Sequence, residues 1–170
     1  MRKVVLLGYM GSGKSVIAEN LAVQMNLPWI DLDQEIEKTT GISVAQLFET
    51  KGELYFRKLE HQKLTELLQS ENSFVLSLGG GTPCYFNNHE LLSQVDSIYL
   101  KATVTTLYNR LVLEREQRPL LATLPDSELQ EFIAKHLFDR AFYYHKANYT
   151  VAVDDKSVDE ITAAIRAILT

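Results

Sequence analysis

The sequence contains a single cysteine, Cys84, so no disulfide bond can form within the chain. A lone thiol fits a reducing compartment. The four histidines are scattered and make no cluster with Cys84 at the spacing of a structural zinc site. We therefore expect the 170 residues to form one domain around a hydrophobic core, without a disulfide or a structural metal.

Long hydrophobic runs are also missing. No stretch approaches the roughly 20 apolar residues that a membrane span requires, and the apolar run Val4–Leu7 is too short for the core of a signal peptide. The formal net charge of −5 argues against the basic face of a nucleic-acid-binding protein. These absences predict a cytoplasmic protein without membrane or nucleic-acid partners. An acidic chain that binds anions must concentrate its positive charge in a cleft.

Short apolar segments alternate with longer amphipathic ones. The apolar segments predict buried strands at residues 3–7, 28–32, 73–78, 97–100 and 149–153. Helical periodicity predicts helices at residues 15–25, 33–39, 44–49, 52–68, 103–116, 127–144 and 157–169. This alternation is typical of an α/β domain, a five-stranded parallel sheet flanked by helices. The long second connection predicts an inserted helical substrate-binding subdomain at about 33–61, and two prolines predict a mobile loop at 117–125.

The stretch Gly8–Ser15 matches the phosphate-loop pattern G-x-x-x-x-G-K-[ST] at every fixed position. Glycines let such a loop turn its N–H groups toward phosphate oxygens, and the following helix presents its positive dipole end to the same anion. Lys14 is expected to reach the β- and γ-phosphates, and the Ser15 hydroxyl to bind Mg²⁺. A chance glycine-rich turn is disfavoured because a strand precedes the motif and a helix follows it. The motif predicts binding of a nucleoside triphosphate, and does not by itself predict a kinase.

No aspartate follows the strand at 73–78, where many phosphate-loop proteins place a metal-supporting carboxylate. Asp31 and Asp33 instead flank Leu32 at the end of the second strand. Residues two apart in an extended chain point to the same side, so Asp31 is expected to support Mg²⁺ and Asp33 to accept a hydrogen bond from a substrate hydroxyl. The alternative that Asp33 only caps the next helix stays open. Three glycines at 79–81 make either a simple turn or a close approach to a ligand, which we favour.

The arginines permit two interpretations. Arg57 and Glu60 are i,i+3 neighbours on a helix, and the simplest interpretation is a solvent-exposed ion pair worth under about 1 kcal/mol. Arg140 allows the same interpretation. Arg118 precedes Pro119 within a candidate lid, where it would close over the phosphates, and Arg110 would lie at the adenine end. The residues alone leave each of these roles open.

In order and spacing, these elements resemble the shikimate kinase family. The matching stretches are the phosphate loop, Asp31–Glu37, Gly41, Gly52, Phe56–Glu60, Leu78–Gly81, Arg118–Leu121, and Arg140 with Tyr144. They extend over nearly the whole chain, and together they are far more specific than the phosphate loop. The resemblance implies a fold like that of the nucleoside monophosphate kinases, with a lid at about 112–125. It also implies transfer of the γ-phosphoryl group of ATP to the 3-hydroxyl of shikimate by a monomer.

The resemblance also implies a role for each matching residue. The implied catalytic residues are Lys14, Asp33 and Arg118, with Asp33 as the base. The implied nucleotide-binding residues are Gly11, Ser12, Gly13, Lys14, Ser15, Val16, Arg110 and Arg118. Shikimate would be bound by Asp33, Arg57, Gly79, Gly80, Gly81 and Arg140, with Arg57 and Arg140 on its carboxylate. Ser15 and Asp31 would serve Mg²⁺.

Some positions depart from the family pattern, and two other functions stay open. Val16 replaces a more usual threonine, and the stretches 52–55 and 82–84 are less typical, although both lie near the expected pocket. A related sugar-acid kinase, for example of the gluconate type, would not require the F-R-x-x-E and R-P-L-L elements present here. A regulatory nucleotide-binding module would be expected to lack Lys14, Asp33 or Arg118, and all three are present.

Overall fold

The five predicted strands form one parallel sheet in the order β2-β3-β1-β4-β5. The computed structural model describes the backbone of residues 1–170 and the side chains of residues 1–118 and 121–170. The strands are β1 (Lys3–Leu7), β2 (Trp29–Asp31), β3 (Phe74–Ser77), β4 (Asp96–Lys101) and β5 (Tyr149–Ala152). Strand β1 is central, with Val5 opposite Leu76 of β3 and Ser97 of β4. The predicted α/β fold is confirmed.

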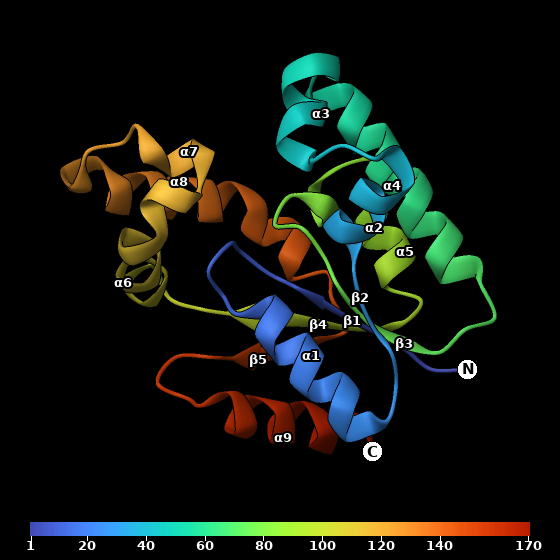
Figure 1. Cartoon of the computed structure of the whole chain (residues 1–170). Helices are drawn as coiled ribbons and strands as arrows, with labels where there is room; N and C mark the ends of the chain where they lie inside the picture. Colours follow the sequence, from blue (N-terminus) through green and yellow to red (C-terminus); the bar gives the residue numbers. More distant parts are fainter.

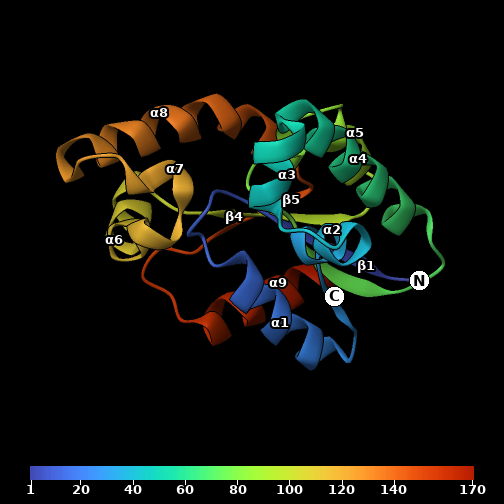
Figure 2. The same ribbon diagram turned by 45° about the horizontal axis from the view of Figure 1, so that its top comes forward.

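Helices cover both faces of this sheet. Figure 1 shows α1 (Lys14–Met25) and α9 (Val158–Leu169) side by side against one face. On the other side lie α4 (Glu53–Gln69), α5 (Asn88–Leu92) and α8 (Asp126–Tyr144), as the turned view in Figure 2 confirms. The central strands are therefore buried on both faces, which is why β1 and β3 are continuous apolar runs without alternation. Among the described residues, no helix has both the length and the apolar character needed to cross a membrane.

Three consecutive helices connect β2 to β3, namely α2 (Leu32–Thr40), α3 (Val44–Lys51) and α4. Local signals set their ends. The Asp31 side chain accepts a hydrogen bond from the Gln34 N–H group at 3.0 Å and caps α2. Ser43 and Gln46 form a capping box that begins α3. The helices predicted in this region are confirmed, and the limits 33–61 of a substrate-binding subdomain stay a prediction.

A second group of helices precedes α8. It contains α6 (Val104–Glu114), the 3₁₀ turn η2 (Arg115–Gln117) and the short helix α7 (Pro119–Ala122). The sequence predicted a loop at 117–125, but part of this stretch is helical because proline is well suited to the first turn of a helix. The mobility of the segment and the lid limits 112–125 stay predictions. The side chains of Pro119 and Leu120, which belong to the R-P-L-L element, lie outside the described residues.

Candidate active site

The phosphate loop joins β1 to α1 and is shaped by glycines. Gly11 and Gly13 have φ angles of 83° and 95°, in the left-handed region that favours glycine. The Lys14 ammonium folds over the loop and donates to the carbonyl oxygens of Gly8 and Tyr9, at 2.8 and 2.9 Å. No side chain caps the start of α1. The first N–H groups of the helix therefore remain available to an anion.

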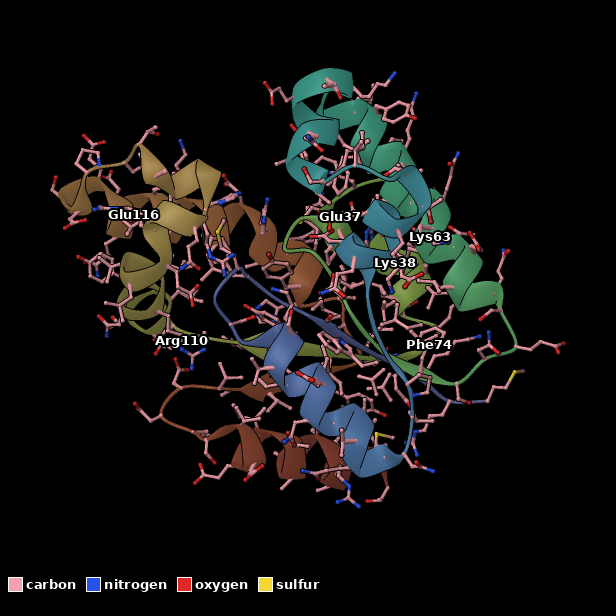
Figure 3. The ribbon with its side chains drawn as sticks, in the orientation of Figure 1. Glu37, Lys38, Lys63, Phe74, Arg110 and Glu116 are labelled. Atoms are coloured by element: carbon pink, nitrogen blue, oxygen red, sulfur yellow. The ribbon has the colours of Figure 1, made fainter. Side chains whose placement is uncertain are left out.

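A cavity of about 590 Å³ opens over this loop. Its walls come from the phosphate loop, from α6 and from the start of α9. Arg110 of α6 donates from Nη1 to the Gly11 carbonyl oxygen at 3.0 Å, which holds α6 against the loop (Figure 3). The apolar side chains Val16, Leu113 and Val158 also line the cavity. The cavity thus combines anion-binding groups at one place with apolar surface for a flat base at another.

Two cations lie where phosphates are expected. Burial lowers the pKa of Lys14 to about 7, and the neighbouring Arg118 acts in the same direction, whereas Asp33 and Asp31 oppose the shift. A bound phosphate group would favour the charged ammonium, since a nearby opposite charge stabilises the ionised form. The positive charges of Lys14 and Arg118 therefore repel each other, and a bound anion would relieve this repulsion.

Asp31 lies beside Ser15, as a shared metal site requires. The Ser15 hydroxyl is 3.5 Å from Asp31 Oδ2, and the Ser77 hydroxyl donates to the same oxygen at 3.3 Å. Oxygen ligands are those that Mg²⁺ prefers, usually one or two from protein, with phosphates and waters completing the shell. Within the described residues, no group of three or more His, Cys, Asp and Glu side chains could hold a metal ion. The pair therefore fits a magnesium ion that is bound together with a nucleotide.

The sequence argument for the two aspartates was wrong in its geometry. Strand β2 ends at Asp31, and Asp33 already lies in the first turn of α2, so the two-residue spacing of a strand does not apply. The capping residue is Asp31, and not Asp33 as the alternative supposed. Both carboxylates still line the large cavity.

A second cavity of about 290 Å³ lies between the α2–α4 helices and α8. It is lined by Asp33, Arg57, Arg140 and the three consecutive glycines. A Cβ atom on Gly81 would come within 2.5 Å of Arg57 Nη2, and one on Gly80 within 3.1 Å of Arg140 Nη1. None of the three glycines has a positive φ. Gly80 and Gly81 have no room for a side chain because an arginine passes directly over the backbone of each.

The simplest interpretation of Arg57 and Glu60, a solvent-exposed ion pair, is wrong, because both side chains are buried. Their exposed fractions are 9% and 1%, and Arg57 Nη1 donates to Glu60 Oε1 at 3.0 Å. The Thr82 hydroxyl donates to Glu60 Oε2 at 2.8 Å. Burial raises the pKa of Glu60, while Arg57 and Thr82 oppose the shift. Removal of one partner of a buried pair typically costs about 3–5 kcal/mol, so this pair supports the wall of the smaller cavity.

Asp33 stands where the two cavities meet. Its Oδ1 atom is buried and has no hydrogen-bond partner. Burial raises the pKa of Asp33 to about 7, and the carboxylates of Glu60 and Asp31 act in the same direction against Arg57. Both cavities share five lining residues: Met10, Asp33, Gly79, Gly80 and Arg118. The arrangement places a carboxylate and an arginine between an anion-binding cavity and a second, arginine-lined cavity.

Comparisons with known proteins show the family of the chain. A family model described as "Shikimate kinase" matches residues 10–170. The chain belongs to the shikimate kinase family. It is 55% identical to the shikimate kinase of Flavobacterium johnsoniae over 99% of both chains. A shikimate kinase structure from Bacteroides thetaiotaomicron has a TM-score of 0.91 and 34% identity, and covers 99% of this chain and 98% of its own. A shikimate kinase from Acinetobacter baumannii, solved in complex with shikimate, has a TM-score of 0.88 and 29% identity over 99% of this chain and 93% of its own.

Membership in the shikimate kinase family makes the chain an ATP-dependent kinase, which confirms the resemblance seen in the sequence. The gluconate-type kinase and the regulatory module are therefore set aside. The structure brings the predicted site residues into two adjoining cavities. Arg118 lies between η2 and α7, lines both cavities, and is paired at 3.0 Å with Glu114, the last residue of α6.

Helix α8 contributes more to the site than Arg140. The Tyr144 hydroxyl donates to the Gly80 carbonyl oxygen at 2.6 Å, and His136 Nδ1 lies 2.9 Å from the hydroxyl of Tyr9 in the phosphate loop. Sequence reasoning assigned no role to Tyr9 or His136. The available signal was the four-residue spacing of His136, Arg140 and Tyr144, which places them on one face of a helix.

Proposed function

We propose that this chain transfers the γ-phosphoryl group of ATP to the 3-hydroxyl group of shikimate, giving shikimate 3-phosphate and ADP. The observation that carries the proposal is the junction of the two cavities at Asp33 and Arg118. A phosphoryl group has to pass between a nucleotide and an acceptor that are both shielded from water. The junction offers such a place, and family membership supports shikimate as the acceptor.

The larger cavity is the proposed nucleotide site. The amide groups of the phosphate loop and Lys14 would hold the β- and γ-phosphates, with Arg110 and Val16 toward the base. Ser15 and Asp31 would hold Mg²⁺, which neutralises phosphate charge when it is bound. The protein contributes mainly position and charge, because phosphoryl transfer needs little covalent work by an enzyme.

The smaller cavity is the proposed shikimate site. Arg57 and Arg140 carry forked guanidinium groups, which match a carboxylate in shape and charge. The unpaired Oδ1 of Asp33 would accept a hydrogen bond from the ring 3-hydroxyl and then its proton. Arg118 would stabilise the charge on the transferring group. A hydroxylated ring with one carboxylate offers a partner to Asp33 and to both arginines of this cavity.

The decisive experiment is to measure ADP release from ATP and Mg²⁺ with shikimate, gluconate, a nucleoside monophosphate or no acceptor. We expect release that only shikimate stimulates, and a product phosphorylated at the 3-position by ³¹P and ¹H NMR. The matched variant is Asp33→Asn, which keeps the size of the side chain and should lose turnover while it still binds ATP. Equal release with gluconate, or without an acceptor, would overturn the proposal.

A further inference from the structure

Arg57 is enclosed by aromatic rings. Its Cζ atom lies 4.2 Å from the centroid of the Tyr85 ring, 5.3 Å from that of Phe56 and 5.7 Å from that of Phe48. Phe56 and Phe48 line the smaller cavity, whereas Tyr85 does not. Tyr85 follows the 3₁₀ turn η1 (Thr82–Cys84), directly after the stretch 82–84 that departs from the family pattern. The shortest of the three contacts therefore comes from outside the cavity wall.

The Tyr85 hydroxyl has a partner of its own. It donates to Glu53 Oε1 at 2.9 Å, and that same oxygen is 3.7 Å from Arg57 Nε. The Nε atom is buried and has no hydrogen-bond partner. A distance of 3.7 Å is too long for a hydrogen bond, so Glu53 stands beside the Nε edge without occupying it. Burial and the Glu53 carboxylate raise the pKa of Tyr85, so the phenol keeps its proton and remains a donor.

We propose that Tyr85 is a positioning residue, which holds the Arg57 guanidinium through its ring and keeps Glu53 from pairing with Nε through its hydroxyl, so that the Nε edge stays free for the substrate carboxylate. The inference rests on the function proposed above, because it assumes that Arg57 receives a carboxylate. Tyr85 stacks on the flat face of the guanidinium, where no N–H group points. Its hydroxyl restrains Glu53, which would otherwise close on Nε as an internal competitor of the substrate.

The geometry explains why such a restraint is needed. Glu60 already occupies Nη1, so a carboxylate that binds Arg57 with two hydrogen bonds has to use the edge formed by Nε and Nη2. Arginine has a long, flexible stem, which loses rotamer entropy when the guanidinium is fixed in one place. The Tyr85 ring on one face and the buried Glu60 carboxylate at Nη1 fix the orientation of the guanidinium before the substrate binds.

The test compares Tyr85→Leu and Tyr85→Phe in steady-state kinetics with shikimate and ATP varied separately. Loss of the ring removes a partly desolvated cation–π contact, so Tyr85→Leu should raise the KM for shikimate about 10-fold. The kcat should stay within about twofold, and the KM for ATP should not change. Tyr55→Leu is the matched control, because Tyr55 is an exposed tyrosine on α4 that contacts Lys51 and not Arg57.

The hydroxyl is tested through Glu53. Tyr85→Phe keeps the ring and releases Glu53, so it should raise the KM for shikimate about threefold, the rise expected from one modest polar contact. In a Glu53→Ala background the same change should have no effect, because the competitor is gone. An equal effect in both backgrounds, or an unchanged KM in Tyr85→Leu, would overturn the inference. Wild-type protein that does not phosphorylate shikimate would instead refute the proposed function itself.

Discussion

At the scale of single residues, Arg118 has the clearest catalytic assignment, because it is one of the two charged side chains that line both cavities. An arginine that stabilises transferring charge is worth about 10³–10⁵ in rate. Arg118→Ala should therefore lower kcat at least about 10³-fold and change the KM for ATP far less. Steady-state kinetics test this against Arg115→Ala, which removes a nearby arginine that lines neither cavity and pairs with Asp126. If kcat survives and only the KM for ATP rises, Arg118 is a binding residue.

Asp31 has two roles that one pair of substitutions separates. It caps α2 and lies beside Ser15 at the proposed magnesium site. Asn is as good a cap as Asp but lacks the charge, so Asp31→Asn should keep stability within about 0.5 kcal/mol. It should also raise the Mg²⁺ concentration for half-maximal rate about 10-fold or more. Asp31→Ala should lose about 1 kcal/mol of stability in addition. The checks are urea unfolding and Mg²⁺ titrations of the rate; an unchanged Mg²⁺ requirement in both variants would remove Asp31 from the site.

The chemical identity of the site residues was predictable from the sequence, but their burial was not. The phosphate loop is continuous in the chain, so its pattern specifies its structure directly. Arg57 and Glu60 are also close in sequence, and their i,i+3 pairing was correctly foreseen. Their burial depends on Phe48 and Tyr85, which belong to other segments and reach Arg57 only through the tertiary fold. For this reason a pair predicted at the surface is an interior one.

At the scale of elements, α8 connects the two cavities through one of its faces. His136 reaches Tyr9 of the phosphate loop, Arg140 reaches the smaller cavity, and Tyr144 binds the carbonyl oxygen of Gly80. The same helix packs against α6, which carries Arg110 and precedes Arg118. A shift of α8 would therefore move donor and acceptor contacts together.

The contact between His136 and Tyr9 predicts an acid-dependent loss of stability. Burial, and secondarily Arg140, lowers the pKa of His136 to about 4 from 6.5, whereas burial raises the pKa of Tyr9 to about 12. The neutral imidazole therefore accepts a hydrogen bond from the phenol. Because the folded-state pKa is lowered, this contribution is complete above pH 6.5 and is lost as the pH falls toward 4.

The matching variant is His136→Gln, whose amide oxygen accepts a hydrogen bond and does not titrate. Its melting temperature should fall less steeply than that of the wild type between pH 6.5 and 4, and the two proteins should be similar at pH 7.5. Thermal unfolding followed by circular dichroism at half-unit pH steps gives the slope of melting temperature against pH for both proteins. Parallel curves of melting temperature against pH would show that protonation of His136 does not contribute to the loss of stability in acid.

Helices and strands with a clear hydrophobic pattern were predictable from the sequence, whereas the short helical elements were not. The five strands and the long helices follow from apolar runs and helical periodicity, with ends set by caps such as Ser43 and Ser157. The five-residue helix α5 and the three-residue turn η1 are too short to show a period. Yet η1 carries Thr82 and leads to Tyr85, which both support the Arg57 pair. The missed turn η1 therefore carries and precedes residues that support the wall of the smaller cavity from behind.

At the scale of the whole molecule, one chain supplies all the described residues of both cavities. The phosphate loop follows β1 and α9 packs beside the sheet, whereas Arg57 comes from α4 and Arg140 from α8. The expectation of a monomer stays a prediction. The two cavities meet only at a few residues. Each ligand should therefore bind mainly to its own cavity.

This separation predicts two independent thermal shifts. A ligand at about 100 times its Kd stabilises a protein by about 2.7 kcal/mol, which for this size of domain is about 5–11 °C in Tm. MgADP and shikimate should each give such a shift. Lys14→Ala should lose the MgADP shift and keep the shikimate shift, and Arg140→Ala should do the reverse. Arg140 is preferred to Arg57 here, because removal of Arg57 leaves the buried Glu60 without its partner.

The control for both variants is Lys58→Ala, an exposed cation on α4 next to Arg57 that lines neither cavity and should keep both shifts. Differential scanning fluorimetry gives the Tm values, and the unliganded Tm of each variant shows whether it is folded. A folded Arg140→Ala protein that loses the MgADP shift as fully as the shikimate shift would show that α8 couples the cavities. In that case donor and acceptor would bind to a single site that α8 assembles, and the two-cavity description would have to be replaced.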